Sequence, residues 1–189
     1  MNKIKEMKEL EVFTKKCKKC ILHNYRKNVV FGSGDINSKF LFIGESPGKK
    51  EDETGIPFCG KAGEILDKLF QSIFLKRKDV YITNVLKCRP PRNRQPRKDE
   101  IEKCSFYLER QIEIIDPEVI ICVGKVSLTF IFERFLKRKN PIISDLHGKL
   151  IEVGKRKIFP VFHPAFAIYN PEKFKIMLKD FEKLREIIC

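Results

Sequence analysis

The sequence has no apolar run long enough to cross a membrane, no internal repeat, no low-complexity tract and no flexible linker. Its first residues, MNKIKEMKELEVF, mix charged with apolar side chains and are unlike a secretory signal peptide. These absences argue against a membrane partner and predict one domain over residues 1–189. We therefore expect a cytoplasmic protein, in a reducing compartment where paired cysteines are better explained as metal ligands than as disulfides.

Acidic residues are few relative to basic ones: 25 Asp and Glu stand against 39 Lys and Arg, which gives a formal net charge of +14. Such an excess predicts a polyanionic partner, most often nucleic acid, although a generally lysine-rich composition is an alternative explanation. Charged residues make up 34% of the chain and apolar residues 42%. This balance is typical of a globular protein with a core rather than of a disordered chain.

Two common nucleotide-binding motifs are also missing. The chain has neither the GKS/T ending of a Walker loop nor a GxGxxG turn. It does have a segment, Gly44–Gly63, with five glycines in twenty residues, and glycine allows close approach of the backbone to a ligand. Phe58 in this segment is either a lid over the core or a platform on which a base stacks.

Four of the seven cysteines form two pairs: Cys17 and Cys20 in a CxxC, and Cys88 and Cys104 with fifteen residues between them. Lysines and arginines flank both pairs, and positive neighbours are expected to lower thiol pKa values and favour the metal-binding thiolate. Four thiolates suit a structural zinc ion or an iron–sulfur cluster. The wide second pair favours the cluster, because a zinc ribbon usually has two short knuckles; ordinary buried thiols are the alternative.

The pattern of apolar runs predicts an α/β fold: a three-layer α/β/α sandwich around a central, mainly parallel, four-stranded sheet. The predicted strands are Phe40–Gly44, Val80–Asn84, Val119–Gly124 and Lys157–His163, with a short extra strand within Asp145–Val153. The predicted helices are Ile4–Lys16, Lys61–Phe74, Lys98–Ile115, Lys125–Lys137 and Pro171–Ile188.

Ligands of parallel sheets bind beyond the carboxyl ends of the strands. The residues expected there are the turn Gly44–Gly48, Asn84, Gly124 and His163. A glycine-rich turn, an amide and an imidazole should therefore meet at one rim, which is the predicted active site.

Five separated motifs carry a resemblance: the cysteine pattern, GESPG, EDETGIPFCGKAGEILD, TNVLKCRPPRNRQP and HPAF. In this order they resemble the family 4 uracil-DNA glycosylases, the iron–sulfur type of archaea and thermophilic bacteria. The resemblance implies excision of uracil from DNA and a four-iron, four-sulfur (4Fe-4S) cluster. The cluster would be held by Cys17, Cys20, Cys88 and Cys104, and would join the N-terminal segment to the 88–104 loop. Cys59, Cys122 and Cys189 are not needed for it.

The resemblance also assigns roles in the pocket. Phe58 matches the aromatic residue that stacks on the flipped uracil, and Asn84 matches the amide that reads the base edge. His163 matches the histidine that hydrogen-bonds uracil O2 and stabilises the charge of the departing base. Each assignment has a simpler structural alternative. Phe58 would be a core aromatic residue, Asn84 a turn former at a strand end, and His163 a residue that caps a turn.

The loop Gly44, Glu45, Ser46 and Pro47 is expected to bind substrate. Glu45 matches the family's loop glutamate. It is expected either to act in catalysis, by orienting water or stabilising a sugar cation, or to organise the loop; blocking the C5 methyl group of thymine is a further alternative. Ser46 stands at the position where the better-known family 1 enzymes carry a catalytic aspartate. Asn93 is expected to support this loop by holding Glu45.

The family also contains a relative, family X, that traps its product covalently through a histidine in a KRRIH insertion. This chain has Glu45 and no such insertion, which favours a monofunctional enzyme that turns over and leaves an abasic site. Uracil-containing DNA, single- or double-stranded, is the expected partner, bound in part by Arg89–Arg97, Leu146–Lys149 and a wedge from HPAF. A sliding clamp is left open as a second partner, and a monomer is expected.

Three alternative functions stay open from the sequence. The first is a glycosylase of the same fold whose main substrate is another deaminated base. The second is a non-catalytic, cluster-containing DNA-binding protein. The third is a redox protein that uses its cluster for electron transfer, because a fold alone does not fix a function.

Overall fold

The computed structural model describes residues 2–188, so the prediction for Cys189 lies outside the described residues. A six-stranded sheet in the order β1-β3-β2-β4-β6-β5 forms its centre. Four neighbouring strands, β3, β2, β4 and β6, run parallel, as predicted. The strands are β1 Ser33–Gly34, β2 Phe40–Gly44, β3 Tyr81–Asn84, β4 Val119–Val123, β5 Ile151–Val153 and β6 Arg156–Val161.

The sheet is larger than the four strands predicted, because a short antiparallel strand closes each edge. At one edge β1 pairs with β3, and at the other β5 pairs with β6. The two residues of β1 carry no apolar signal, and β5 is only partly buried. Edge strands of this kind are held by backbone hydrogen bonds, so a search for apolar runs does not find β1.

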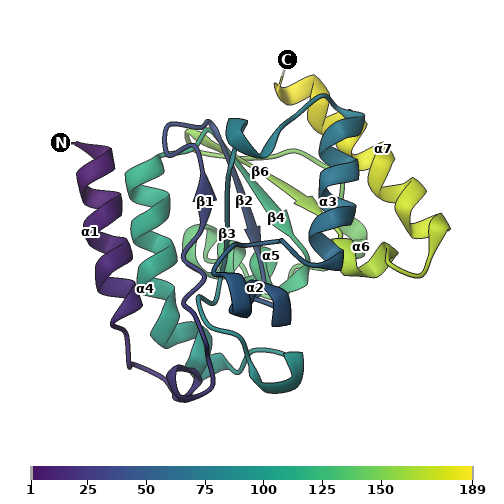
Figure 1. Cartoon of the computed structure of the whole chain (residues 1–189). Helices are drawn as coiled ribbons and strands as arrows, with labels where there is room; N and C mark the ends of the chain where they lie inside the picture. The colour runs from purple at the N-terminus through teal and green to yellow at the C-terminus, as the bar shows by residue number, and fades with distance from the viewer. Residues whose placement is uncertain (1, 189) are drawn as a thin grey trace.

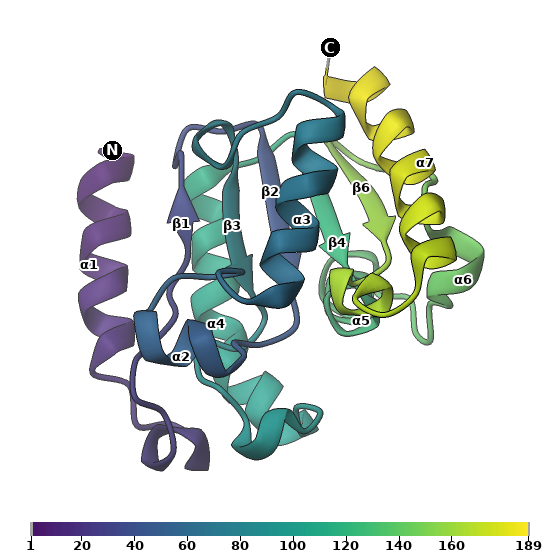
Figure 2. The same ribbon diagram turned by 45° about the vertical axis from the view of Figure 1, so that its right-hand side comes forward.

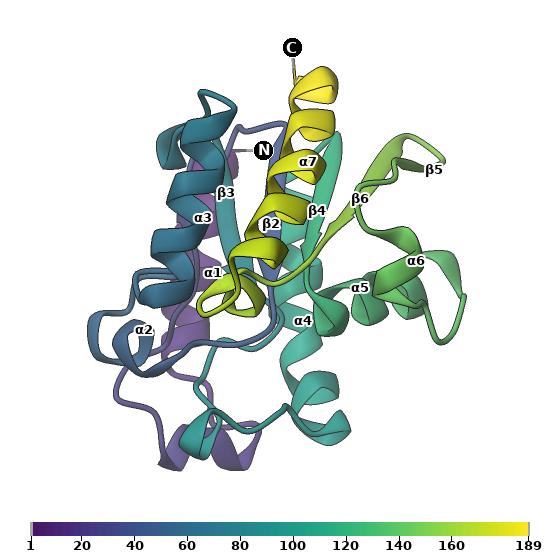
Figure 3. The same ribbon diagram turned by 90° about the vertical axis from the view of Figure 1, so that its right-hand side faces the viewer.

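Helices cover both faces of the sheet, which confirms the three-layer fold (Figure 1). One face packs against α1 (Lys3–Lys15), α4 (Lys98–Ile115) and α5 (Lys125–Ile131). The other packs against α3 (Lys61–Ser72) and α7 (Pro171–Ile188), which lie in front of the sheet when the molecule is turned (Figure 3). Two short helices, α2 (Lys49–Thr54) and α6 (Ile143–Leu146), lie between the strands in sequence.

Alternate residues of each central strand enter different cores. On β2, Leu41 and Ile43 belong to the core beneath α1, α4 and α5, whereas Phe42 belongs to the core beneath α3 and α7. This alternation follows from the pleat of a strand, which points successive side chains to opposite faces. A strand that is apolar at every position is therefore the signature of a sheet covered on both sides.

The prediction for residues 145–153 was partly wrong. Only Ile151–Val153 form a strand, whereas Asp145 and Leu146 end α6 and Gly148 adopts a positive φ of 65°. An alternation of apolar and polar residues over so short a stretch does not distinguish a strand from a single helical turn. Among the described residues, no helix combines the length and the apolar character needed to span a membrane.

A buried ammonium group joins the end of β3 to α4. Lys87 is 1% exposed, and its Nζ donates to Thr83 Oγ1 at 2.7 Å, the Asn84 carbonyl at 2.7 Å and Gln111 Oε1 at 2.6 Å. Gln111 is fully buried and donates from Nε2 to the Phe31 carbonyl at 3.0 Å. Burial lowers the pKa of Lys87 to about 7. In its charged form the ammonium has three acceptors for three donors, and this network fixes the backbone of Asn84.

Replacing Gln111 by methionine should lower the free energy of unfolding by about 1–3 kcal/mol, because Lys87 loses a buried acceptor. Urea unfolding followed by circular dichroism measures this change. Glu113→Met on the exposed side of the same helix is the matched control and should change stability by less than about 0.5 kcal/mol. Equal effects of the two substitutions would show that the network does not stabilise the fold.

Candidate functional site

A cleft of about 580 Å³ opens at the carboxyl ends of the parallel strands, where α2 lies in Figure 2. The predicted rim is therefore hollowed, and the loop after β2, the end of β3 and the segment after β6 all line it. The residues that line the cleft include Glu45, Ser46, Pro47, Gly48, Lys49, Lys50, Glu51, Phe58, Lys61, Asn84, Asn93 and His163. Gly124 is not among the lining residues, although it lies against His163.

The register of the sheet places Gly44 directly beside Asn84. A Cβ atom at position 44 would lie 2.3 Å from Asn84 Oδ1 and 2.5 Å from the tip of the Phe58 ring. Any side chain larger than hydrogen at position 44 would therefore displace both groups. Gly44 does not line the cleft itself. The absence of a side chain at this position leaves room for the Phe58 ring and the Asn84 amide, which do line it.

Phe58 combines both roles considered for it, because it packs in the core beneath α3 and also lines the cleft. Its backbone adopts a left-handed φ of 51°, which is unusual for a residue with a side chain. Arg77 holds this conformation: its guanidinium donates to the Phe58 carbonyl at 2.5 Å and to the Pro57 carbonyl at 3.2 Å, and pairs with Asp67 at 2.6 Å. Arg77 was not singled out from the sequence, because nothing in its local pattern points to a loop some twenty residues away.

His163 follows β6 and is held as a neutral imidazole. Its Nδ1 accepts a hydrogen bond from the Ala165 backbone N–H at 3.2 Å, so the ring proton of the neutral form resides on Nε2. Burial lowers the pKa of His163 to about 4, against a smaller opposite effect of the charge on Glu51. The Phe58 and His163 rings lie 5.7 Å apart between centroids, so an aromatic surface and an N–H donor share one wall of the cleft.

Two carboxylates line the cleft. Burial raises the pKa of Glu45, whose backbone carbonyl accepts from the Leu86 N–H at 3.0 Å and so keeps the loop after β2 on the end of the sheet. Glu51 is 8% exposed, and its Oε1 accepts from the Gly60 N–H at 2.8 Å, which ties α2 to the loop that follows Phe58. Sequence reasoning missed Glu51, although its place in the EDET motif could have drawn attention to it.

Asn93 reaches the same cleft from the opposite loop, but its side chain has a different partner from the one expected. Asn93 Oδ1 accepts from Arg89 Nε at 2.7 Å, and no hydrogen bond joins it to Glu45 among residues 2–188. Arg92 and Asn93 both have positive φ values, 54° and 56°. This tight turn brings Asn93 close to Arg89, which is four residues earlier in the chain.

The four paired cysteines line one small cavity between the N-terminal segment and the start of α4. Cys88 and Cys104 are buried, and Cys17 and Cys20 are partly exposed. Arg26 joins the two pairs: its guanidinium donates to Cys88 Sγ at 3.2 Å and to the Cys17 carbonyl at 2.8 Å. Two segments more than sixty residues apart in sequence are therefore held together around the sulfur atoms.

The expected lowering of the thiol pKa values is wrong for three of these cysteines. Burial raises the pKa of Cys20, of Cys88 and of Cys104, the last to about 12. The charges of Arg26 and Lys87 oppose this effect for Cys88 and Cys104 but do not exceed it. Loss of contact with water costs a thiolate more than nearby cations return, so a metal that binds here must displace protons.

Four sulfur atoms around one cavity form a donor set of the kind that a structural zinc ion or an iron–sulfur cluster uses. In the described part of the chain, no group of three or more Cys, His, Asp or Glu side chains is placed to hold a metal ion.

Comparison with known proteins agrees with this geometry. A family model described as the uracil DNA glycosylase superfamily matches residues 31–188. A type-4 uracil-DNA glycosylase of Archaeoglobus fulgidus is 46% identical, with 90% of this chain and 87% of the relative covered. Another, of Saccharolobus solfataricus, is 45% identical over 92% of this chain and 82% of the relative. The chain belongs to the type-4 uracil-DNA glycosylase family.

The type-4 likeness extends to the N-terminal cysteine pair. The superfamily match begins at residue 31, after Cys17 and Cys20. A type-4 uracil-DNA glycosylase of Sulfurisphaera tokodaii, 43% identical, is aligned with 99% of this chain and covers the pair. The cysteine cavity is therefore built partly from residues that precede the superfamily match.

The neutral state of His163 is open to direct measurement. In a nuclear magnetic resonance titration, its imidazole should titrate near pH 4, because burial disfavours the imidazolium. Glu51→Gln should lower this midpoint further, since the charge on Glu51 favours the protonated ring. A midpoint near the ordinary value of about 6.5 would contradict the proposed environment.

Proposed function

We propose that this protein is a monofunctional DNA repair glycosylase, which rotates uracil out of DNA and hydrolyses its N-glycosidic bond. The observation that carries the proposal is the meeting of Phe58, Asn84 and a neutral His163 in one cleft. These groups offer a stacking surface, an edge-reading amide and a hydrogen-bond donor, which is what a flipped base needs. Membership of the type-4 family supports the same substrate.

Asn84 supplies the selectivity in this proposal. Its amide can donate to uracil O4 and accept from N3–H, whereas cytosine presents a donor and an acceptor at those positions. Because Asn84 is 2% exposed and its backbone is fixed by Lys87, the amide cannot easily turn to suit cytosine. The wrong base would leave buried polar groups unpaired, which discriminates strongly.

His163 supplies the stabilisation of the leaving group. When the glycosidic bond breaks, negative charge develops on the base, and the Nε2–H of a neutral imidazole can donate to O2. The bond from the Ala165 N–H fixes the proton on the useful nitrogen before substrate arrives. A preorganised donor of this kind needs no rearrangement in the transition state.

The two carboxylates that line the cleft have different roles in this proposal. We assign Glu45 to the attacking water or to the positive charge that develops on the sugar, and Glu51 to holding the loop of Phe58 through Gly60. The lysines at the rim, Lys49, Lys50 and Lys61, are exposed and suit DNA phosphates. One chain provides all of these groups, which is consistent with a monomeric enzyme. We expect it to act on DNA in the cytoplasm.

The decisive test is incubation with a labelled oligonucleotide that carries one deoxyuridine, analysed with and without alkali. Strand cleavage only after alkali is expected, because a monofunctional enzyme leaves an abasic site. His163→Ala should slow excision about 100- to 1,000-fold through loss of the donor. Asn37→Ala, at the amino end of β2, is the control and should leave the rate unchanged. Binding without excision by the unaltered protein would reject the proposal.

We further propose that Cys17, Cys20, Cys88 and Cys104 hold a 4Fe-4S cluster. It would be a structural group that joins the N-terminal segment to the loop between Cys88 and α4, since binding energy at such a site counts as folding energy. The support is the shared cavity of the four sulfurs and the membership of the type-4 family.

Anaerobically purified protein should be brown and contain iron and acid-labile sulfide in equal amounts. Cys17→Ser should lose most of both and lower the melting temperature. Cys59→Ser should keep them, because Cys59 lies outside the cavity and contacts Thr54. One zinc ion per chain with no sulfide would show that a simple structural metal occupies the site instead.

A further inference from the structure

A second hollow, of about 430 Å³, lies beside the cysteine cavity and has no role in the function proposed above. Tyr25 and Ile21 form one wall of this Tyr25 groove, and the loop that carries Arg92, Arg94 and Arg97 forms the other. The first wall follows Cys20 and the second follows Cys88. All three ribbon views place residues 16–26 and 88–97 at the same end of the molecule (Figures 1 to 3).

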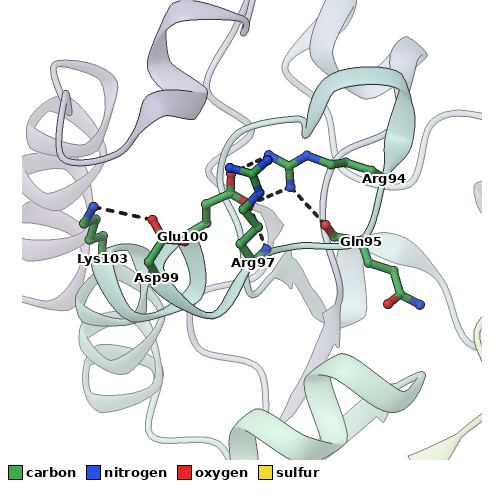
Figure 4. A network of polar contacts seen from close by, with 6 residues as sticks. All are labelled: Arg94, Gln95, Arg97, Asp99, Glu100 and Lys103. Atoms are coloured by element: carbon green, nitrogen blue, oxygen red, sulfur yellow. Dashed lines mark hydrogen bonds and ion pairs between the residues drawn. The ribbon is translucent and has the colours of Figure 1, made fainter.

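The groove carries uncompensated positive charge. Glu100 is fully buried and binds the Arg94 guanidinium through both oxygens, at 2.5 Å and 2.8 Å (Figure 4). Arg97 lies beside the same carboxylate and also favours its charged form. Arg92 is exposed and forms no ion pair within residues 2–188. Two guanidinium groups, those of Arg94 and Arg97, thus share one buried carboxylate, and Arg92 adds a third positive charge to the lining of the groove, so the surplus charge suits an anion.

Tyr25 is an exposed aromatic ring on a rigid support. It is 58% exposed, and its neighbour in the wall of the groove, Ile21, is 46% exposed. The next residue, Arg26, anchors the backbone through Cys88 Sγ and the Lys15 and Cys17 carbonyls. A ring fixed at its base and open to solvent is the arrangement that stacks on a nucleobase.

The Tyr25 groove and the uracil cleft share one loop. Asn93 lines the cleft, and its neighbours Arg92 and Arg94 line the groove. Arg92 and Asn93 both have left-handed backbone conformations. The sharp turn that they form sends Asn93 to the cleft and its two neighbours to the groove. Such backbone strain in residues with side chains is typical of functional loops. Because the two sites share this turn, a DNA strand whose deoxyuridine occupies the cleft would cross the turn and enter the groove.

We propose that the Tyr25 groove binds the single strand on one side of the uracil, with a base stacked on Tyr25 and phosphates on Arg92 and Arg97. The inference deepens the proposed function, on which it rests. Aromatic stacking and arginine contacts together bind single strands without regard to sequence. The groove would hold the strand next to the flipped nucleotide, and would raise affinity rather than the rate of bond cleavage.

Binding of a labelled, uracil-free oligothymidylate of about 12 nucleotides, followed by fluorescence anisotropy, tests the groove. Tyr25→Ala should weaken binding about tenfold, and Tyr25→Phe should restore it because the ring suffices. Arg92→Ala and Arg97→Ala should each reduce the dependence of log affinity on log salt by about one. Arg138→Ala, an exposed arginine outside the groove, should leave binding almost unchanged. Equal losses for Tyr25→Ala and Tyr25→Phe, or for Arg92→Ala and Arg138→Ala, would overturn the proposal.

The kinetics of uracil excision distinguish a failure of the groove proposal from a failure of the proposed glycosylase function. With a deoxyuridine oligonucleotide, Tyr25→Ala should raise KM about tenfold and leave kcat within about twofold. Truncating the oligonucleotide from one end should remove this difference, and truncation from the other should not. An unaltered KM for Tyr25→Ala would reject DNA binding in the Tyr25 groove and would leave the proposed glycosylase function untouched. An unaltered protein that binds oligothymidylate through Tyr25 but excises no uracil would reject the glycosylase instead.

Discussion

The parallel register that sets Gly44 beside Asn84 is the constraint on which the uracil cleft depends. The missing Cβ of Gly44 gives room to Phe58 and Asn84 at once, and Lys87 then fixes the Asn84 backbone from inside the core. His163 enters from the end of another strand of the same sheet. Of the groups proposed to recognise the base, Asn84 and His163 therefore lie at or just after strand ends, whereas Phe58 lies in the loop between α2 and α3 and is held there by Arg77. A rigid scaffold holds all three at fixed spacing.

Loss of contact with water decides the chemistry of both cavities. Burial keeps His163 neutral, so that it can donate without carrying charge, and it raises the pKa values of Glu45 and of the buried thiols. For His163, Cys88 and Cys104 a charge of opposite sign lies within reach, yet the cost of desolvation is larger. Counting neighbouring lysines along the sequence therefore predicts the wrong direction for Cys88 and Cys104.

The cysteine cavity and the uracil cleft are joined by the loop that contains Arg92 and Asn93. Arg26 ties the N-terminal segment to one end of this loop, and Glu100 holds its other end through Arg94. A group bound among the cysteines would therefore stabilise a segment that borders the cleft without contacting it.

The continuous apolar runs, such as Phe40–Gly44, determined the parallel sheet and its layers, because only a doubly covered strand is apolar at every position. The strand ends placed Asn84 and His163 at one rim, since parallel strands end on one side, and the family resemblance assigned Phe58 to the same pocket. The tertiary structure alone decided the edge strand at Ser33, the clamp of Arg77 on Phe58 and the partner of Asn93. Each depends on a contact between distant segments, or on burial, and neither quantity is encoded in any local stretch of the chain.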